Sequence, residues 1–319
     1  MNARILTTAA LAALFCGALP AAAADPQILN LVMPDAEVVA GINVQQATAT
    51  PFGQYVLSLI APQDQQIQAL ATLIGFDPRR DVRELLVASA GATGAAARVG
   101  LAFARGSFDP AKIAAAATLA GAKSETYGGL TILEDAKQTG GVVFVDATLA
   151  VLGDLASVKA AIDRRTAPTL LPAALSAQVN QWSLSQDAWV VDMAPLASLR
   201  PPAGAPKLPG LAQAAAFQFI QQASAGVRFG PMVLVSAQAQ ADTAQNAAAL
   251  AGVIQLVTNL AQAQAGQNPQ AAMLLKSMTV TAQGNALNLT MALPQDQIQQ
   301  LVKPGTTQLR QARPPAKKM

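Results

Sequence analysis

The sequence predicts an α+β protein made of two related β-α-β-β-α-β-β-α halves, with a largely antiparallel sheet and helices on one face. Stretches with apolar residues at every second position are typical of strands, and they alternate with stretches of helical periodicity. Two short runs recur in matched order: Asp35–Val39 resembles Asp187–Val191, and Lys123–Thr126 resembles Lys276–Thr279. The second run begins 88 residues after the first in one half and 89 residues after it in the other. This matched spacing predicts an internal duplication.

The first residues have the pattern of an export signal. Arg4 precedes the apolar run Ile5–Leu19, and Ala22–Ala24 supplies the small residues that signal peptidase requires, with cleavage before Asp25. A lipoprotein signal at Cys16 is disfavoured, because a bulky phenylalanine precedes that cysteine. The chain therefore divides into a signal peptide (residues 1–24), a first half (25–170), a second half (171–302) and a disordered basic tail (303–319). Export predicts a periplasmic or extracellular protein.

In the first half, Glu37–Val44 alternates as a strand, and Thr50 followed by Pro51 is a typical helix start. Asp77-Pro78 and Asp109-Pro110 are also helix starts, so helix capping is the favoured role of both aspartates. The further elements expected in this half are a helix over Asp64–Ile74, strands over Leu85–Ser89 and Val99–Ala104, a helix over Asp109–Leu119, strands over Thr126–Leu133 and Val142–Leu152 (the latter broken near residues 146–148), and a helix over Leu155–Arg164.

The second half follows a linker at residues 166–186. The expected elements are a helix over Pro172–Leu184, a strand over Ala188–Met193, a Pro/Gly-rich loop over Pro201–Pro209, a helix over Leu211–Gln222, strands over Gly226–Phe229 and Met232–Ala239, a helix over Thr243–Gln264, strands over Met278–Gln283 and Leu287–Leu293, and a last helix over Gln297–Val302. The long helix carries no formal charge, but its many amide side chains exclude a membrane span.

Composition excludes several kinds of chemistry. The chain has no histidine, and its single cysteine, Cys16, leaves with the signal peptide. Catalytic triads with histidine, histidine-ligated haem and zinc sites of histidine or cysteine are therefore excluded, and no disulfide is possible. No acidic cluster has calcium-loop spacing. We expect neither a cofactor nor a metal.

Charge is distributed unevenly along the chain. Residues 25–302 hold 15 basic and 18 acidic side chains, whereas the tail holds five basic side chains and no acid. A nucleic-acid-binding protein would carry a basic face on its fold, so that class is excluded. Only four basic and four acidic residues lie in 171–302, which favours a protein partner or self-association. The basic residues of the tail are Lys303, Arg310, Arg313, Lys317 and Lys318.

The densest charge cluster contains Arg79, Arg80 and Arg83. Guanidinium groups bind carboxylate or phosphate in a bidentate manner, so these three residues are candidates for an anion-binding site. The favoured alternative is a solvated turn whose local ion pairs contribute little.

Trp182 and Trp189 flank the start of the second half. They are candidates for lining an apolar pocket, and the favoured alternative is that they anchor the linker helix on the sheet. Asp192 lies in an apolar strand and is a candidate general base with a raised pKa. The favoured alternative places it on an open face or at a strand end.

The chain resembles a group of uncharacterised exported bacterial proteins found in acidobacteria, and this resemblance implies no activity. It covers nearly the whole mature chain. The residues that carry it are Pro34-Asp35-Ala36, Val39–Val44, Pro51-Phe52-Gly53-Gln54, Phe76-Asp77-Pro78-Arg79 and Asp187–Val191.

Three hypotheses of function follow. The leading one is a non-enzymatic exported protein that binds a protein partner or an apolar ligand between its two halves. The second is a hydrolase or lyase that uses Arg79, Arg80 and Asp192. The third is an envelope-associated protein whose tail contacts an anionic surface, at about 1 kcal/mol per tail charge.

Overall fold

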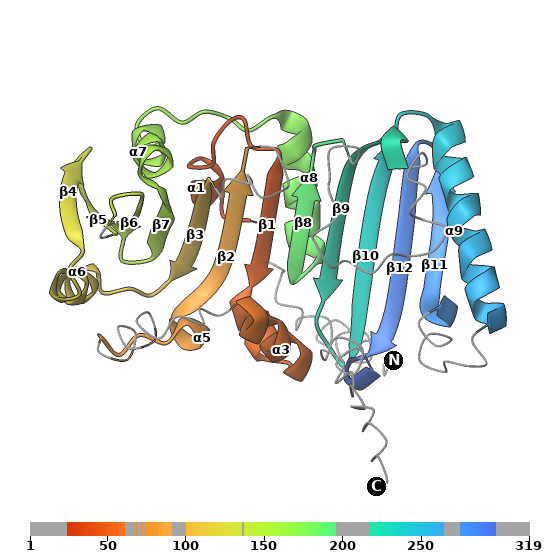
Figure 1. The fold of residues 1–319 in the computed structure, drawn as a ribbon, viewed down its shortest axis with the longest axis horizontal. Helices are drawn as coiled ribbons and strands as arrows, with labels where there is room; N and C mark the ends of the chain where they lie inside the picture. Colours follow the sequence, from red (N-terminus) through yellow and green to blue (C-terminus); the bar gives the residue numbers. More distant parts are fainter. Residues whose placement is uncertain are drawn as a thin grey trace, which may run out of the picture.

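The computed structural model describes residues 24–60, 68, 72, 74–90, 100–135, 137–195, 217–264 and 275–297. The strands of this part form one antiparallel sheet of 12, in the order β11-β12-β10-β9-β8-β1-β2-β3-β7-β6-β5-β4 (Figure 1). The predicted α+β class with a largely antiparallel sheet is confirmed. The strands of the first half are β1 (Val38–Asn43), β2 (Val82–Ser89), β3 (Leu101–Gly106), β4 (Lys123–Tyr127), β5 (Leu130–Glu134), β6 (Gly140–Asp146) and β7 (Leu149–Asp154). Those of the second half are β8 (Ala188–Asp192), β9 (Ile220–Arg228), β10 (Met232–Ala241), β11 (Met278–Gln283) and β12 (Ala286–Pro294).

The two halves join through their first strands. Strand β1 pairs with β8 at the centre of the sheet, with Val38 opposite Asp192 and Ala40 opposite Val190. In the predicted repeat, Val38 and Ala40 of the first half correspond to Val190 and Asp192 of the second. The repeat therefore exchanges these two pairs, as a two-fold relation between the halves requires. The duplication itself stays a prediction, because the first half has an additional hairpin, β6–β7, between β3 and β5.

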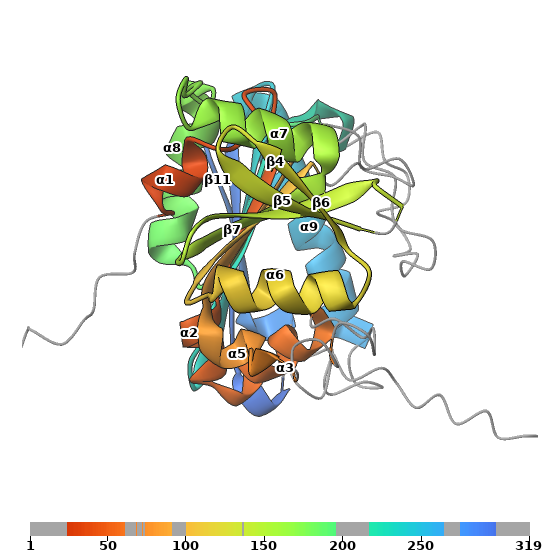
Figure 2. The same cartoon turned by 90° about the vertical axis from the view of Figure 1, so that its left-hand side faces the viewer.

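Helices lie on both faces of the sheet, whereas the sequence predicted helices on one face. Helices α1 (Pro26–Leu29), α7 (Leu155–Arg164) and α8 (Ala173–Ser185) share a core with one face, which we call the α8 face. Helices α3 (Pro51–Ile60) and α9 (Ala244–Gln264) pack on the other, the α9 face. Figure 2 shows α7 and α6 (Pro110–Leu119) on opposite sides of strands β4 to β7. The reason is that several strands have apolar residues on both sides, so each side requires cover.

The main core lies under the α8 face. It contains the fully buried Leu86 and Phe103 together with both tryptophans, Trp182 from α8 and Trp189 from β8. Trp189 lies directly across from Gly41, where an added Cβ would come within 2.6 Å of the indole ring. Both tryptophans therefore hold α8 against the sheet.

Two expected elements differ from the structure. The single strand expected over Thr126–Leu133 is a hairpin, β4–β5, that turns at Gly128-Gly129 with φ of 53° and 78°. Only glycine adopts such angles without strain, so this pair ends one strand and starts the next. The helix expected over Leu211–Gln222 is wrong over residues 217–222, the part of it that the structure describes. Residues 217–219 form a 3-10 turn, and β9 begins at Ile220.

The short helices at strand ends follow the capping predictions. The Asp77 side chain accepts a hydrogen bond from the Arg79 amide at the start of α5 (Pro78–Asp81), and Asp109 caps α6 in the same way. Helix α2 (Val44–Thr48) continues directly from β1 and is capped by Asn43. The loop over Pro201–Pro209, most of the helix over Asp64–Ile74 and the tail over 303–319 lie outside the described residues.

Candidate binding site

One row of side chains crosses the α9 face from β5 to β11 and ends before the edge strand β4, where Ser124 lies opposite Leu133. Strand register places its members side by side, because residues directly opposite each other in an antiparallel pair point to the same face. All of them are apolar, and we call them the apolar row. Its members, in strand order from β5 to β11, are Leu133, Val142, Leu152, Ala102, Val87, Ala40, Val190, Ala225, Ala237, Leu289 and Val280.

The centre of the apolar row is open. Val87, Leu152 and Val190 are 38%, 36% and 37% exposed, and they stand on β2, β7 and β8. Their chain neighbours on the α8 face are fully buried: Leu86 is 0% exposed and Val191 is 1% exposed. An open face of an antiparallel sheet normally carries polar residues. An apolar open face is therefore a candidate contact surface.

The open part is bounded on the sheet. At one end of the row, α9 packs over Val280 and its neighbours. Along one side, the next row of side chains, which includes Ile42 and Leu85, belongs to a cluster with α2 and α3 residues. The open part spans strands β7, β3, β2, β1 and β8, a length of about 19 Å at the usual strand spacing. It is therefore a strip about 19 Å long, covered along one side by the α2 and α3 cluster and bordered along the other by Val38 and Asp192.

Asp192 borders this strip. It is the last residue of β8 and pairs with Val38 on one side and Ala223 on the other. Its Oδ1 accepts a hydrogen bond of 2.8 Å from the Ala194 amide. Desolvation raises the pKa of the Asp192 carboxyl, against the opposing effect of this hydrogen bond.

The predicted arginine cluster lies at the opposite end of the strands. Arg80 bonds to Asp81 at 2.7 Å and to the Gly75 carbonyl at 2.9 Å, and it is largely exposed. Arg83, near the start of β2, donates to the Gly106 carbonyl at 3.3 Å. Ser89 lies six residues after Arg83 on β2 and is level with Asp192, so the distance along the sheet is about 20 Å. The structure therefore does not bring the arginines and Asp192 into one site, and Trp182 and Trp189 lie on the other face.

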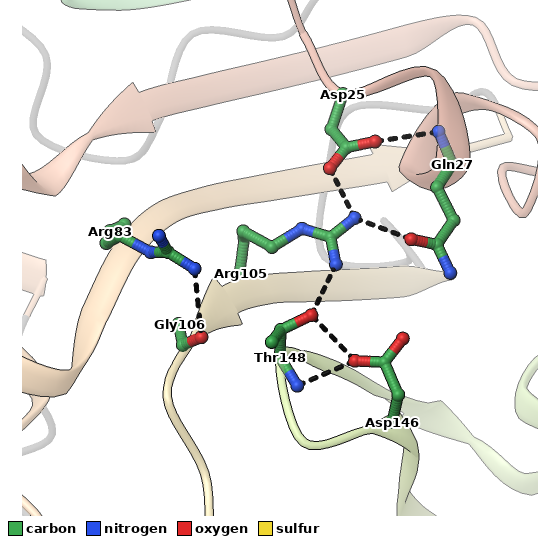
Figure 3. A network of polar contacts seen from close by, with 7 residues as sticks. All are labelled: Asp25, Gln27, Arg83, Arg105, Gly106, Asp146 and Thr148. Carbon is green, nitrogen blue, oxygen red and sulfur yellow. Dashed lines mark hydrogen bonds and ion pairs between the residues drawn. The ribbon is translucent and has the colours of Figure 1, made fainter.

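Sequence reasoning missed a charged network at the edge of the α8 face (Figure 3). Arg105 on β3 forms an ion pair with Asp25 and donates to Gln27 and Thr148, each at 2.9 Å. Thr148 in turn donates to Asp146 at 2.7 Å. The sequence did contain a signal for this network, because Arg105 is a charged residue inside an otherwise apolar strand.

Glu84 lies beside Arg105 on the paired strand β2. Burial, and after it the Asp25 charge, raise the pKa of Glu84 to about 7 against the opposing effect of Arg105. The network joins α1 to the sheet, and we assign it a structural role.

A shallow polar groove of about 180 Å³ lies beside α8. Its lining is neutral, with Gln181, Ser185 and Gln186 from the α8 end facing Gln238 and Asn288. Gln238 donates to Asn288 at 2.9 Å, so part of this lining is already satisfied internally.

A second hollow of about 220 Å³ lies beside α5 and α6. Its lining includes Phe76, Asp81 and Lys112. Within the described ranges no group of three or more carboxylates gathers in a way that could hold a metal ion. Across these same ranges, no helix is long and apolar enough to cross a membrane.

Comparison with known proteins supports the fold alone. No family model and no curated protein matches the chain. The crystal structure of the protein TP0453 in crystal form III superposes with a TM-score of 0.53, covers 88% of this chain and 98% of that chain, and is 12% identical. Crystal form IV gives a TM-score of 0.51 over 90% of this chain and 99% of that chain, again at 12% identity. The chain thus shares its overall fold with TP0453, and the resemblance to the acidobacterial group stays a prediction.

Proposed function

We propose that this chain is an exported, non-enzymatic binding protein that holds an apolar ligand on the open part of the apolar row. The observation that carries the proposal is the exposure of Val87, Leu152 and Val190 on a face where solvent would favour polar side chains. Burying three such side chains further would contribute favourable free energy on binding. The absence of histidine from the sequence agrees with a role without acid–base catalysis at neutral pH.

The shape of the strip favours an aliphatic chain over a helix of a protein partner. Side chains on one face of a strand recur about every 7 Å, and an α-helix with its side chains is about 10–12 Å across. One neighbouring row is already covered by the α2 and α3 cluster. A single extended aliphatic chain fits along the row beside this covered side.

The test is binding of an uncharged naphthalene fluorophore to the full exported chain. We expect saturable binding, and each of Val87→Gln and Val190→Gln should weaken it about fivefold, or about 1 kcal/mol, because each removes partly exposed apolar surface. Leu170→Gln is the matched control, since Leu170 is exposed but lies outside the row. Circular dichroism of each variant verifies folding. Equal affinity of all variants, or no binding, would contradict the proposal.

Export itself is part of the proposal. Asp25, the expected first residue of the processed chain, caps α1 and forms an ion pair with Arg105. The first helix therefore begins directly after the expected cleavage site. Amino-terminal sequencing of the protein from the cell envelope and the medium tests this, and a first residue far from Asp25 would contradict it.

Attachment through the tail remains a separate proposal, because residues 303–319 lie outside the described part. Deletion of this segment should abolish sedimentation with anionic vesicles at low salt, since salt screens such contacts. Unchanged sedimentation after the deletion would rule the attachment out.

A further inference from the structure

Asp192 is the charged group nearest to the open part of the apolar row along β8. It lies two residues after Val190 in the same strand, so both side chains point to the α9 face. Residues two apart on a strand are about 7 Å apart. The carboxyl group therefore stands at the border of the strip, beside one of its three exposed apolar side chains.

The Asp192 carboxylate has no counter-ion among the residues that the structure describes. The Ala194 amide donates a hydrogen bond to its Oδ1. Asp187, at the start of the same segment, provides the contrast: its Oδ2 accepts a hydrogen bond of 2.6 Å from the Phe229 amide, and the charge of Arg228 acts on it. Both carboxyl groups are partly buried, and only Asp187 has a neighbouring cation.

We propose that the ligand of the apolar row is a cationic amphiphile, whose aliphatic chain lies along the row and whose ammonium group forms an ion pair with Asp192. This inference rests on the proposed function and deepens it, because it names the class of ligand. A partly desolvated carboxylate without a counter-ion gains most from a cation.

The same geometry disfavours other head groups. A ligand on the strip covers part of the surroundings of Asp192, and covering a carboxylate without pairing it costs free energy. An uncharged head leaves that cost uncompensated, and an anionic head adds repulsion. The expected order of affinity is therefore dodecylammonium, then dodecanol, then dodecanoate.

The experiment measures binding of these three amphiphiles to the full chain by titration calorimetry, below the concentrations at which they self-associate. We expect dodecylammonium to bind at least about tenfold more tightly than dodecanol, a difference of about 1.4 kcal/mol. Asp192→Asn is the decisive variant, because asparagine retains an oxygen that accepts the Ala194 amide and loses the charge. It should reduce dodecylammonium binding about tenfold and leave dodecanol binding the same or tighter.

Asp187→Asn is the matched control, since this residue is partly buried in the same segment and already has Arg228 beside it. It should leave the preference for the ammonium head unchanged. If all three amphiphiles bind and Asp192→Asn does not alter their order, the inference is wrong and the proposed function stands. If dodecanoate binds as tightly as dodecylammonium, the inference is also wrong. If none of the amphiphiles nor the uncharged fluorophore binds, the proposed function fails as well.

Discussion

Both faces of the central strands carry apolar side chains, but the two faces differ in what covers them. On the α8 face, Val39, Leu86 and Val191 lie under α1, α7 and α8 and are essentially inaccessible. On the α9 face, Val87 and Val190 belong to the same strands and remain more than a third exposed. Residue type alone therefore does not separate core from surface in this sheet.

This difference reflects which helices pack on each face of the sheet. The α8 face receives three helices around the first half and the junction of the halves, where the largest buried side chains gather. Among the described residues, the α9 face is covered by α2, α3, α6 and α9, and the side chains of the apolar row between them stay partly exposed. An open part that only had to be stable in water would favour polar residues, and the apolar side chains there are the basis of the binding function proposed above.

The sharpest test of this contrast uses two neighbouring valines on β8. Val191→Ala should lower the free energy of unfolding by about 2–3 kcal/mol, because it removes two buried carbon groups and leaves a cavity. Val190→Ala should cost less than about 1 kcal/mol, since that side chain is already partly in solvent. Urea unfolding of both variants measures the difference. Equal costs would show that the α9 face is as tightly packed as the α8 face.

The charged residues of the α8 face provide a second test. Glu84 has a pKa of about 7 in the folded chain and an ordinary value of 4.5, so folding favours its protonated form. Its contribution to stability is therefore fully present below pH 4.5 and is lost as the pH rises through 7. The difference amounts to about 3 kcal/mol. Glu84→Gln should raise the free energy of unfolding by about this amount at pH 8 relative to the natural chain, with little change at pH 4.

Urea titrations of the two proteins at both pH values measure this effect. Glu37→Gln controls for the loss of one negative charge, because Glu37 is exposed near the sheet end. If the gain in the free energy of unfolding from Glu84→Gln is the same at pH 4 and pH 8, burial does not raise the pKa of Glu84. The neighbouring network in Figure 3 is then less tightly packed than the structure shows.

Local signals in the sequence predicted much of the fold. Asp77 and Asp109 cap helices as expected because capping depends on a few neighbouring atoms. The Gly284-Asn285 turn between β11 and β12 is also local, and its predicted strands are present. The hairpin at Gly128-Gly129 could have been found from the same kind of signal, since a glycine pair within a strand pattern indicates a turn.

The arrangement of the sheet and the apolar row could not be predicted in this way. The row exists because eleven strands share one register, and register depends on pairs far apart in the sequence, such as Ala40 with Val190. Alternation shows that both sides of β1 are apolar, but the side that each helix covers is decided by tertiary packing. Asp192 was a candidate from its place in an apolar strand, and only the paired strands show that it borders the row.

The last test uses two glycines with opposite surroundings. Gly41→Ala would place a methyl group within 2.6 Å of the Trp189 ring, so the indole must move from the core of the α8 face, at a cost of about 1–3 kcal/mol. Gly252, inside α9, has nothing within 4 Å of an added Cβ. Gly252→Ala should therefore stabilise the chain, by up to about 1 kcal/mol, through helix propensity alone. Thermal unfolding shows whether each substitution stabilises or destabilises the chain, and tryptophan fluorescence reports whether Trp189 has moved. A neutral Gly41→Ala with unchanged fluorescence would mean that the α8 face yields as readily as the open α9 face, and the contrast between the two faces would then lose its basis in packing.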